Sequence, residues 1–221
     1  MAKHLHRDLE QLTKDLLGLG GRVEEAINKA ITALVERRLD LAEEVIMGDA
    51  AIDQRELEVE EDCLKILALH QPVAADLRFL VAVIKVNNDL ERMGDLAANM
   101  ASRALYLSSH EPVAAASRLG EMAARVRRMV SASLDSLVNR DAAKAKEVCA
   151  LDDDVDQMNK DMFSLIQDAI RKDPETVKRG IQVLSVSRHL ERLADHATNI
   201  AEDVVFMVEG EMIRHPGLGE I

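Results

Sequence analysis

Residues 85–101 read KVNNDLERMGDLAANMA, and residues 185–201 read SVSRHLERLADHATNIA. At an offset of 100 positions the two stretches share eight of seventeen residues, namely Val86, Leu90, Glu91, Arg92, Asp95, Ala97, Asn99 and Ala101. Two unrelated stretches of this length would share about one residue, so an internal duplication explains the match better. The sequence therefore predicts two similar halves.

The chain of 221 residues is expected to be all-α. It has no Trp, one Tyr and three Phe, so its core must be built from Leu, Val, Ile, Ala and Met, most of which are good helix formers. Apolar residues at helical spacing predict helices at residues 4–38, 40–70, 72–107, 113–138, 141–171 and 173–213. We expect their N-termini to be marked by Asp40, Pro72, Asp141 and the Asp173–Pro174 pair.

Short connections between these helices favour antiparallel neighbours. The simplest architecture is two similar three-helix bundles, one formed by residues 1–109 and the other by residues 110–221.

Composition and charge argue against several kinds of partner. Lys and Arg number 28 and Asp and Glu 40, so the formal net charge is −12, and such an acidic chain repels nucleic acid. The longest apolar runs, residues 79–84 and 204–208, are far shorter than the roughly 20 residues of a membrane span. The N-terminus has no apolar signal region, and Cys63 and Cys149 form no CxxC motif. We expect a cytoplasmic protein without nucleic-acid binding or membrane insertion.

Paired carboxylates accompany the duplicated motif. Asp49 and Asp53 lie 23 and 19 residues before Pro72. Glu91 and Asp95 lie 19 and 23 residues after it. A helical hairpin that turns near Pro72 brings both pairs to one level, roughly 28 Å from the turn at 1.5 Å per residue. The second half repeats this pattern with Asp152, Asp156, Glu191 and Asp195.

Four carboxylates at one level repel each other, raise one another's pKa or bind a cation. Neither set contains His or Cys, and an all-oxygen site suits Mg²⁺, Ca²⁺, Mn²⁺ or iron better than structural zinc. We expect Asn99 and Asn199 to orient the ligands. Arg92 and Arg192 are expected to neutralise part of the negative charge.

Two alternatives remain open at this point. The acids could face solvent or pair with Lys and Arg on a helical scaffold, or the chain could be a metal-storing or metal-oxidising helical bundle. Di-iron chemistry in bundles usually needs Glu-x-x-His, which the chain lacks, and GxSxG, HExxH and P-loop motifs are also absent. We therefore expect no enzymatic activity, and we expect His189 and His196 at the surface rather than among the ligands.

The chain resembles the PhoU family of phosphate-signalling regulators. The resemblance rests on DAAID (49–53), QPVAADLR (71–78), LERMGD (90–95), DDDVD (152–156) and LERLAD (190–195). It implies two three-helix bundles related by a pseudo-twofold axis, each with a multinuclear iron or zinc cluster on its surface. One cluster would be held by Asp49, Asp53, Glu91 and Asp95, and the other by Asp152, Asp156, Glu191 and Asp195.

The resemblance also implies a function without catalysis. Family members act as negative regulators of phosphate uptake and phosphate-starvation signalling. They are adaptors between a Pst-type phosphate ABC transporter, through its ATPase subunit, and a PhoR-type sensor histidine kinase. On this basis we expect a cytoplasmic homodimer or higher oligomer that reaches the inner membrane only through these partners.

Overall fold

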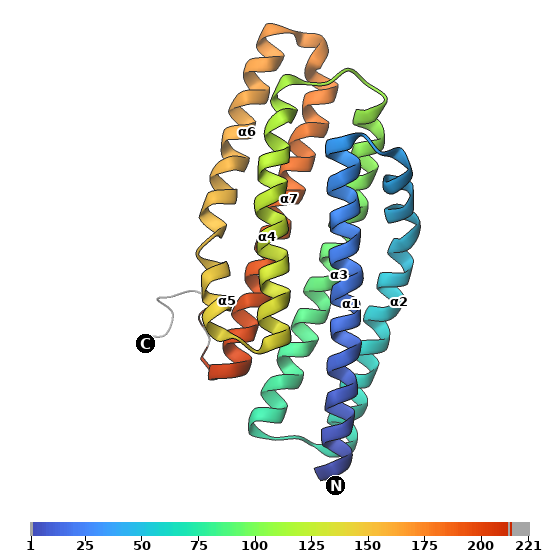
Figure 1. Ribbon diagram of the computed structural model, residues 1–221, viewed down its shortest axis with the longest axis vertical. Coiled ribbons are helices and arrows are strands. Elements are labelled where there is room, and N and C mark those ends of the chain that lie inside the picture. The colour runs from blue at the N-terminus through green and yellow to red at the C-terminus, as the bar shows by residue number, and fades with distance from the viewer. Residues whose placement is uncertain (1, 212, 214–221) are drawn as a thin grey trace.

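The computed structural model of the chain describes residues 2–211 and 213, and the regular elements in this part are all helices (Figure 1). Its elements are α1 (Ala2–Glu36), α2 (Leu39–His70), α3 (Ala74–Ser108), η1 (Ala114–Ala116), α4 (Ser117–Asn139), α5 (Ala142–Cys149), α6 (Asp152–Lys172), η2 (Pro174–Thr176) and α7 (Val177–Glu209). The predicted all-α class is confirmed. None of the helices in this described part is long and apolar enough to cross a membrane.

Of two aspartates predicted to cap helix N-termini, Asp141 does so and Asp40 does not. Asp141 is confirmed as an N-cap, because its Oδ1 accepts a hydrogen bond from the backbone N–H of Lys144 at 3.0 Å. Asp40 is not a cap. Arg38 occupies the N-cap of α2, and Asp40 lies in the first turn, where its carboxylate pairs with the Arg38 guanidinium at 2.6 Å.

Other boundaries also differ from the prediction. The fifth predicted helix is divided at residues 150–151 into α5 and α6. The third starts at Ala74, after Pro72, and the fourth and sixth each begin with a short 3₁₀ turn. The last helix ends at Glu209, because Gly210 takes a left-handed conformation with φ of 78° and closes the helix.

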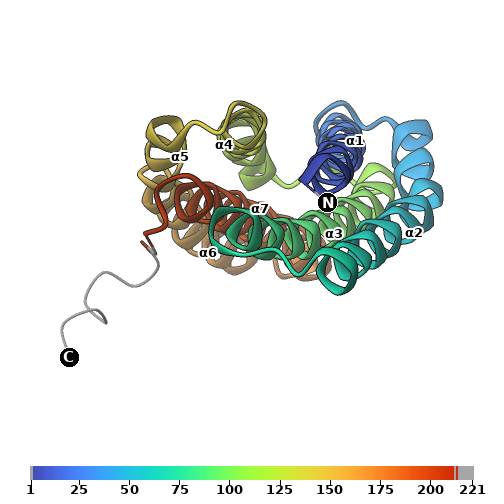
Figure 2. The same cartoon turned by 90° about the horizontal axis from the view of Figure 1, so that it is seen from below.

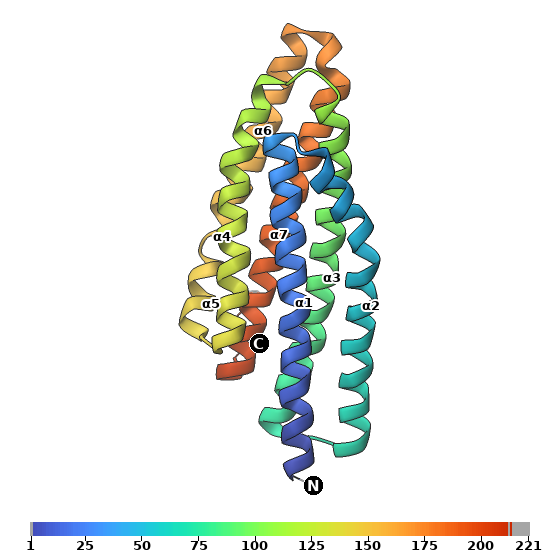
Figure 3. The ribbon, with the colours of Figure 1, turned by 45° about the vertical axis from the view of Figure 1, so that its right-hand side comes forward.

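The helices form two bundles that share a central pair. Figure 2 shows α3 and α7 side by side, with α2 beside α3, α5 and α6 beside α7, and α1 and α4 covering the same side of the pair. In Figures 1 and 3, α3 and α7 run in opposite directions. The predicted pair of three-helix bundles is confirmed, and α3 and α7 join them. The boundary between residues 109 and 110 stays a prediction.

Polar contacts link α3 to α7 across this joint. Lys85 Nζ donates to Asp203 Oδ1 at 3.1 Å, and the Asp203 side chain is only 2 % exposed. Asp89 Oδ1 lies 2.7 Å from His196 Nδ1 and accepts a hydrogen bond from Asn199 Nδ2 at 3.3 Å. The expectation that His196 lies at the surface is therefore wrong, since this side chain bridges the two bundles.

His189 is not a surface residue either. It is partly buried on α7, and neither ring nitrogen has a hydrogen-bond partner among the described residues. Burial, with the nearby Arg103 guanidinium, lowers the pKa of His189. A single repeat could not reveal this burial, because it arises where the two halves meet.

Within the first bundle, α2 and α3 approach closely at Gly94. A Cβ added to Gly94 would lie 3.0 Å from Ile52 Cγ2, and Ile52 is buried. Ile52 directly precedes Asp53, and Gly94 directly precedes Asp95. The missing side chain at Gly94 therefore sets how near the two acidic helix faces come to each other.

We predict that Gly94→Val destabilises the protein by about 1–3 kcal/mol, because the added methyl groups overpack the contact with Ile52. Urea unfolding followed by circular dichroism measures the change. Gly18→Ala is the matched control, since a Cβ at Gly18 would meet nothing within 4 Å. That control should gain about 0.5–1 kcal/mol of stability. Equal stability of Gly94→Val and the wild type would contradict the close approach.

Candidate metal centres

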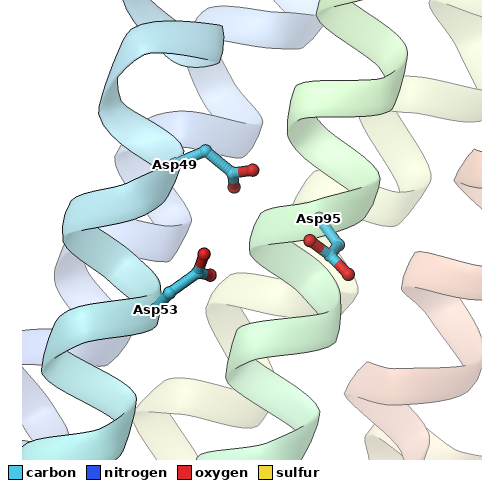
Figure 4. A group of neighbouring side chains, drawn as sticks. All are labelled: Asp49, Asp53 and Asp95. Carbon is cyan, nitrogen blue, oxygen red and sulfur yellow. The ribbon is translucent and has the colours of Figure 1, made fainter.

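Three aspartates of the predicted set meet between α2 and α3. Asp49, Asp53 and Asp95 each offer a carboxylate oxygen, and these oxygens all lie within 4.8 Å of one another. Figure 4 shows Asp49 and Asp53 extending from α2 toward α3, where Asp95 faces them. Their spacing of four residues places Asp49 and Asp53 on one face of α2. We call these three residues and Glu91 the first acidic cluster.

The acids of the first acidic cluster act on one another electrostatically. Burial raises the pKa of Asp49, and the charges of Asp53 and Asp95 raise it further. Burial also raises the pKa of Glu91, with added repulsion from Asp95, Asp53 and Asp49. Arg92 opposes this rise at Glu91, in the direction expected of a neutralising arginine. The cluster therefore holds more negative charge than its own arginine balances.

Glu56 was missed by the repeat-based reading of the sequence. Asn87 Nδ2 donates to both the backbone oxygen and Oε1 of Glu56, each at 3.0 Å, and Asn87 is 1 % exposed. Burial raises the pKa of Glu56, and Glu60, Glu91 and Asp53 raise it further. The spacing of residues 49, 53, 56 and 60 along one helix face could have indicated it.

The second acidic cluster comprises Asp152 and Asp156 at the start of α6 and Glu191 and Asp195 on α7. Burial raises the pKa of Asp152 to about 6, with further repulsion from Asp195 and Asp156. Asp152 Oδ1 is buried and has no hydrogen-bond partner among the described residues. Burial also raises the pKa of Glu191, and the charge of Asp156 raises it further. Burial likewise raises the pKa of Asp195, to which Glu191 adds repulsion. The four predicted acids thus act on each other here too.

The two clusters differ in how closely they are assembled. Within the described residues, only Asp49, Asp53 and Asp95 bring three candidate ligand atoms within 4.8 Å of one another. The second acidic cluster begins at Asp152, the first residue of α6, directly after the break between α5 and α6. In contrast, α2 continues without a break through the first acidic cluster.

The two asparagines predicted to orient the ligands bond elsewhere. Asn99 Nδ2 donates to the backbone oxygen of Asp95 at 2.8 Å, one turn earlier on its own helix. Asn199 Nδ2 donates to Asp89 across the joint between the bundles. Arg192, like Arg92 in the first half, lowers the pKa of the glutamate beside it. An orienting role for the asparagines stays a prediction.

The donor chemistry of both clusters fits a hard cation. All eight predicted ligands are carboxylates, and oxygen donors suit Mg²⁺, Mn²⁺, Ca²⁺ and iron. A cation among them would favour the ionised carboxylates and offset the burial and repulsion that raise the pKa of Asp49, Glu91, Asp152, Glu191 and Asp195. The buried Oδ1 of Asp152 is an acceptor that such a cation would satisfy.

Comparison with known proteins gives one family throughout. The profile of the PhoU domain matches residues 16–104 and 119–204. A phosphate-specific transport system accessory protein PhoU homolog from Aquifex aeolicus is 38 % identical over 216 residues, covering 98 % of each chain. A protein of the same description from Pseudomonas putida is 36 % identical and covers 99 % of this chain and 86 % of its own length.

Solved structures agree with the sequence relatives. The crystal structure of PhoU from Pseudomonas aeruginosa matches with a TM-score of 0.91 and 35 % identity, covering 93 % of this chain and 99 % of its own. The phosphate transport system regulatory protein PhoU from Streptococcus pneumoniae matches with a TM-score of 0.84 and 33 % identity, covering 95 % and 99 %.

We predict that Asp152→Asn stabilises the metal-free protein at neutral pH. In the folded protein the pKa of Asp152 is raised from its ordinary value of 3.8 to about 6. The stability that protonated Asp152 contributes is therefore fully present below pH 4 and is lost as the pH rises through 6. The shift corresponds to at most about 3 kcal/mol, and partial exposure reduces this to about 1–2 kcal/mol. Urea unfolding of wild type and variant at pH 4 and pH 7 measures the difference.

Asp40→Asn is the control, because the pKa of Asp40 is lowered in the folded protein whereas that of Asp152 is raised. The hydrogen bond with Arg38 lowers the pKa of Asp40 to about 2. The stability that ionised Asp40 gives the folded protein is therefore present above pH 4 and is lost as the pH falls toward 2. A stability difference between Asp152→Asn and wild type that is the same at pH 4 and pH 7 would contradict the raised pKa of Asp152.

Proposed function

The chain belongs to the PhoU family, and on this premise we propose that it is an accessory regulator that restrains phosphate uptake and phosphate-starvation signalling. The observation that carries the proposal is the match over nearly the whole length of a phosphate-specific transport system accessory protein, at 38 % identity. Both halves match the PhoU domain, so the similarity is not confined to one motif. The proposed role is one of contact with partners rather than of catalysis.

We propose two partners in the cytoplasm. One is the ATPase subunit of a Pst-type phosphate ABC transporter, and the other is a PhoR-type sensor histidine kinase. The formal charge of −12 suits docking on basic surfaces of such proteins. A homodimer or higher oligomer is also part of the proposal. In this arrangement the protein reports the state of the transporter to the kinase when phosphate is plentiful.

We further propose that each acidic cluster binds metal, with multinuclear iron or zinc implied by the family resemblance and Mg²⁺ or Mn²⁺ as alternatives. The residues that would hold it are Asp49, Asp53, Glu91 and Asp95 in the first half and Asp152, Asp156, Glu191 and Asp195 in the second. Bound metal would supply positive charge that fixes each helical hairpin. The carboxylates act as ligands, while Arg92 and Arg192 reduce the remaining negative charge.

The regulatory role is tested by gene deletion. In phosphate-rich medium, deletion should raise a phosphate-starvation reporter such as alkaline phosphatase, because the restraint on the kinase is lost. The wild-type gene supplied in trans should return the reporter to its low level. An unchanged reporter in a strain without a second copy of the gene would contradict the proposal and favour a metal-storing or metal-oxidising protein.

The metal centres are tested by removing ligands from one cluster. We expect Glu91→Ala with Asp95→Ala to keep the helical circular dichroism spectrum and to lose the metal of the first half, because two of its four ligands are gone. Mass spectrometry of metal content after loading with Fe²⁺ or Mn²⁺ measures this. Glu10→Ala with Glu121→Ala removes the same charge from exposed positions on α1 and α4 and should retain all metal. Full metal content in the cluster variant would contradict the assignment.

A further inference from the structure

The two acidic clusters share their four acids but differ in the residues beside them. The acids of α2 and α6 correspond at an offset of 103, and those of α3 and α7 at an offset of 100. At four neighbouring positions the second half has a more positive residue. The pairs are Glu56 and Asn159, Leu57 and Lys160, Glu60 and Phe163, and Asn88 and Arg188. Other positions change the other way, among them Ala50 to Asp153, Ala51 to Asp154 and Arg55 to Met158.

These neighbours act on the clusters electrostatically. Lys160 Nζ lies 3.9 Å from Asp156 Oδ2. Arg188 and Arg192 both lower the pKa of Glu191, whereas Arg92 lowers that of Glu91. Counting the cluster acids and the groups that interact with them, the first half has five carboxylates and one arginine, and the second has five carboxylates, two arginines, a lysine and His196. With His196 neutral, the formal charges are −4 and −2.

Glu56 adds a fifth carboxylate beside the four acids of the first acidic cluster, and its hydrogen bond has a counterpart in the second half. Asn87 holds Glu56 in the first half. At the corresponding positions, Ser187 Oγ donates to Asn159 Oδ1 at 2.7 Å. The link between the two helices of each hairpin is kept, but in the second half it holds a neutral amide. In the first half it fixes an additional carboxylate whose charge acts on Glu91 and Asp53.

The backbone around the two clusters also differs, and this difference favours tighter metal binding at the first acidic cluster. Three acids of the first acidic cluster already have oxygens within 4.8 Å of one another on continuous helices. The second acidic cluster starts at the first residue of α6, beside a helix break. A preorganised and more negative site binds a divalent cation more tightly than a looser and less negative one.

We propose that the two clusters are unequal, the first being a tight metal site whose affinity depends on Glu56 held by Asn87, and the second a weaker site that exchanges its metal. This inference rests on the proposed metal binding. It assigns Glu56 as a positioning and charge-determining residue of the first site, and Asn159, Lys160 and Arg188 as the residues that weaken the second.

The test uses Mn²⁺ as the probe, with free Mn²⁺ measured by electron paramagnetic resonance. Glu191→Ala with Asp195→Ala leaves only the first site, and Glu91→Ala with Asp95→Ala leaves only the second. We expect the first site alone to bind Mn²⁺ at least tenfold more tightly than the second alone. Adding Glu56→Gln should weaken the first site by about tenfold, since one nearby negative charge is removed. Adding Asn159→Glu should tighten the second by a similar factor.

Glu58→Gln is the matched control on α2, because Glu58 pairs with Arg55 at 2.6 Å and is absent from the charges that act on the cluster acids. It should leave the Mn²⁺ affinity of the first site unchanged. Asn87→Ala should weaken the first site, because Glu56 loses the amide that holds it. Circular dichroism of each variant checks that the helices persist.

The outcomes separate this inference from the proposed function. Equal affinities at the two sites, or a Glu56→Gln variant that binds Mn²⁺ like its parent, would overturn the inequality while the metal centres stand. Failure of the wild-type protein to bind Mn²⁺, iron or zinc would overturn both the metal centres and the inference. A tight first site that is weakened by Glu56→Gln and not by Glu58→Gln supports the proposal.

Discussion

Apolar packing between α2 and α3 holds carboxylates together against their mutual repulsion. Ile52 and Val59 of α2 and Leu90 and Met93 of α3 are buried, and each such side chain contributes about 1.5–3 kcal/mol when it leaves water. Gly94 lets the helices approach closely at the level of the acids. Burial raises the pKa of Asp49, and repulsion from Asp53 and Asp95 raises it further, so this arrangement disfavours the ionised carboxylate. Packing between the two helices therefore holds the acids of the first acidic cluster near one another.

The duplicated hairpins are joined through the same helices that carry their acids. Asp89, which contacts His196 of the other half, is two residues from Glu91, and His196 directly follows Asp195. The Lys85–Asp203 contact lies on the same two helices. The orientation of α3 is thus fixed both by its own bundle and by α7. For this reason the position of each acidic face depends on packing in both halves.

The sequence predicted the fold well because its main determinants are local or repeated. Helical spacing, the Asp141 cap and the duplicated LERxxD motif all describe elements within one half, and the structure has them. The break at residues 150–151 contains neither Gly nor Pro and gave no local sign. His189 and His196 were misjudged because their surroundings come from the opposite bundle. Glu56 was overlooked because its counterpart is Asn159, so a search for shared residues passes over it.

The differences between the halves are more informative about the sites than their similarities. Shared acids identify where two clusters lie, but they give both clusters the same chemistry. The substitutions beside the second acidic cluster alter the charge in both directions. Asn159 stands where the first half has Glu56 and Lys160 where it has Leu57, whereas Asp153 stands where it has Ala50 and Met158 where it has Arg55. Because both hairpins keep a hydrogen bond at the position of Glu56 and Asn159, the change there alters charge without loss of the link between helices. Both halves therefore keep the link between their two helices at this position, while the exchange of a carboxylate for an amide changes the charge beside the acids.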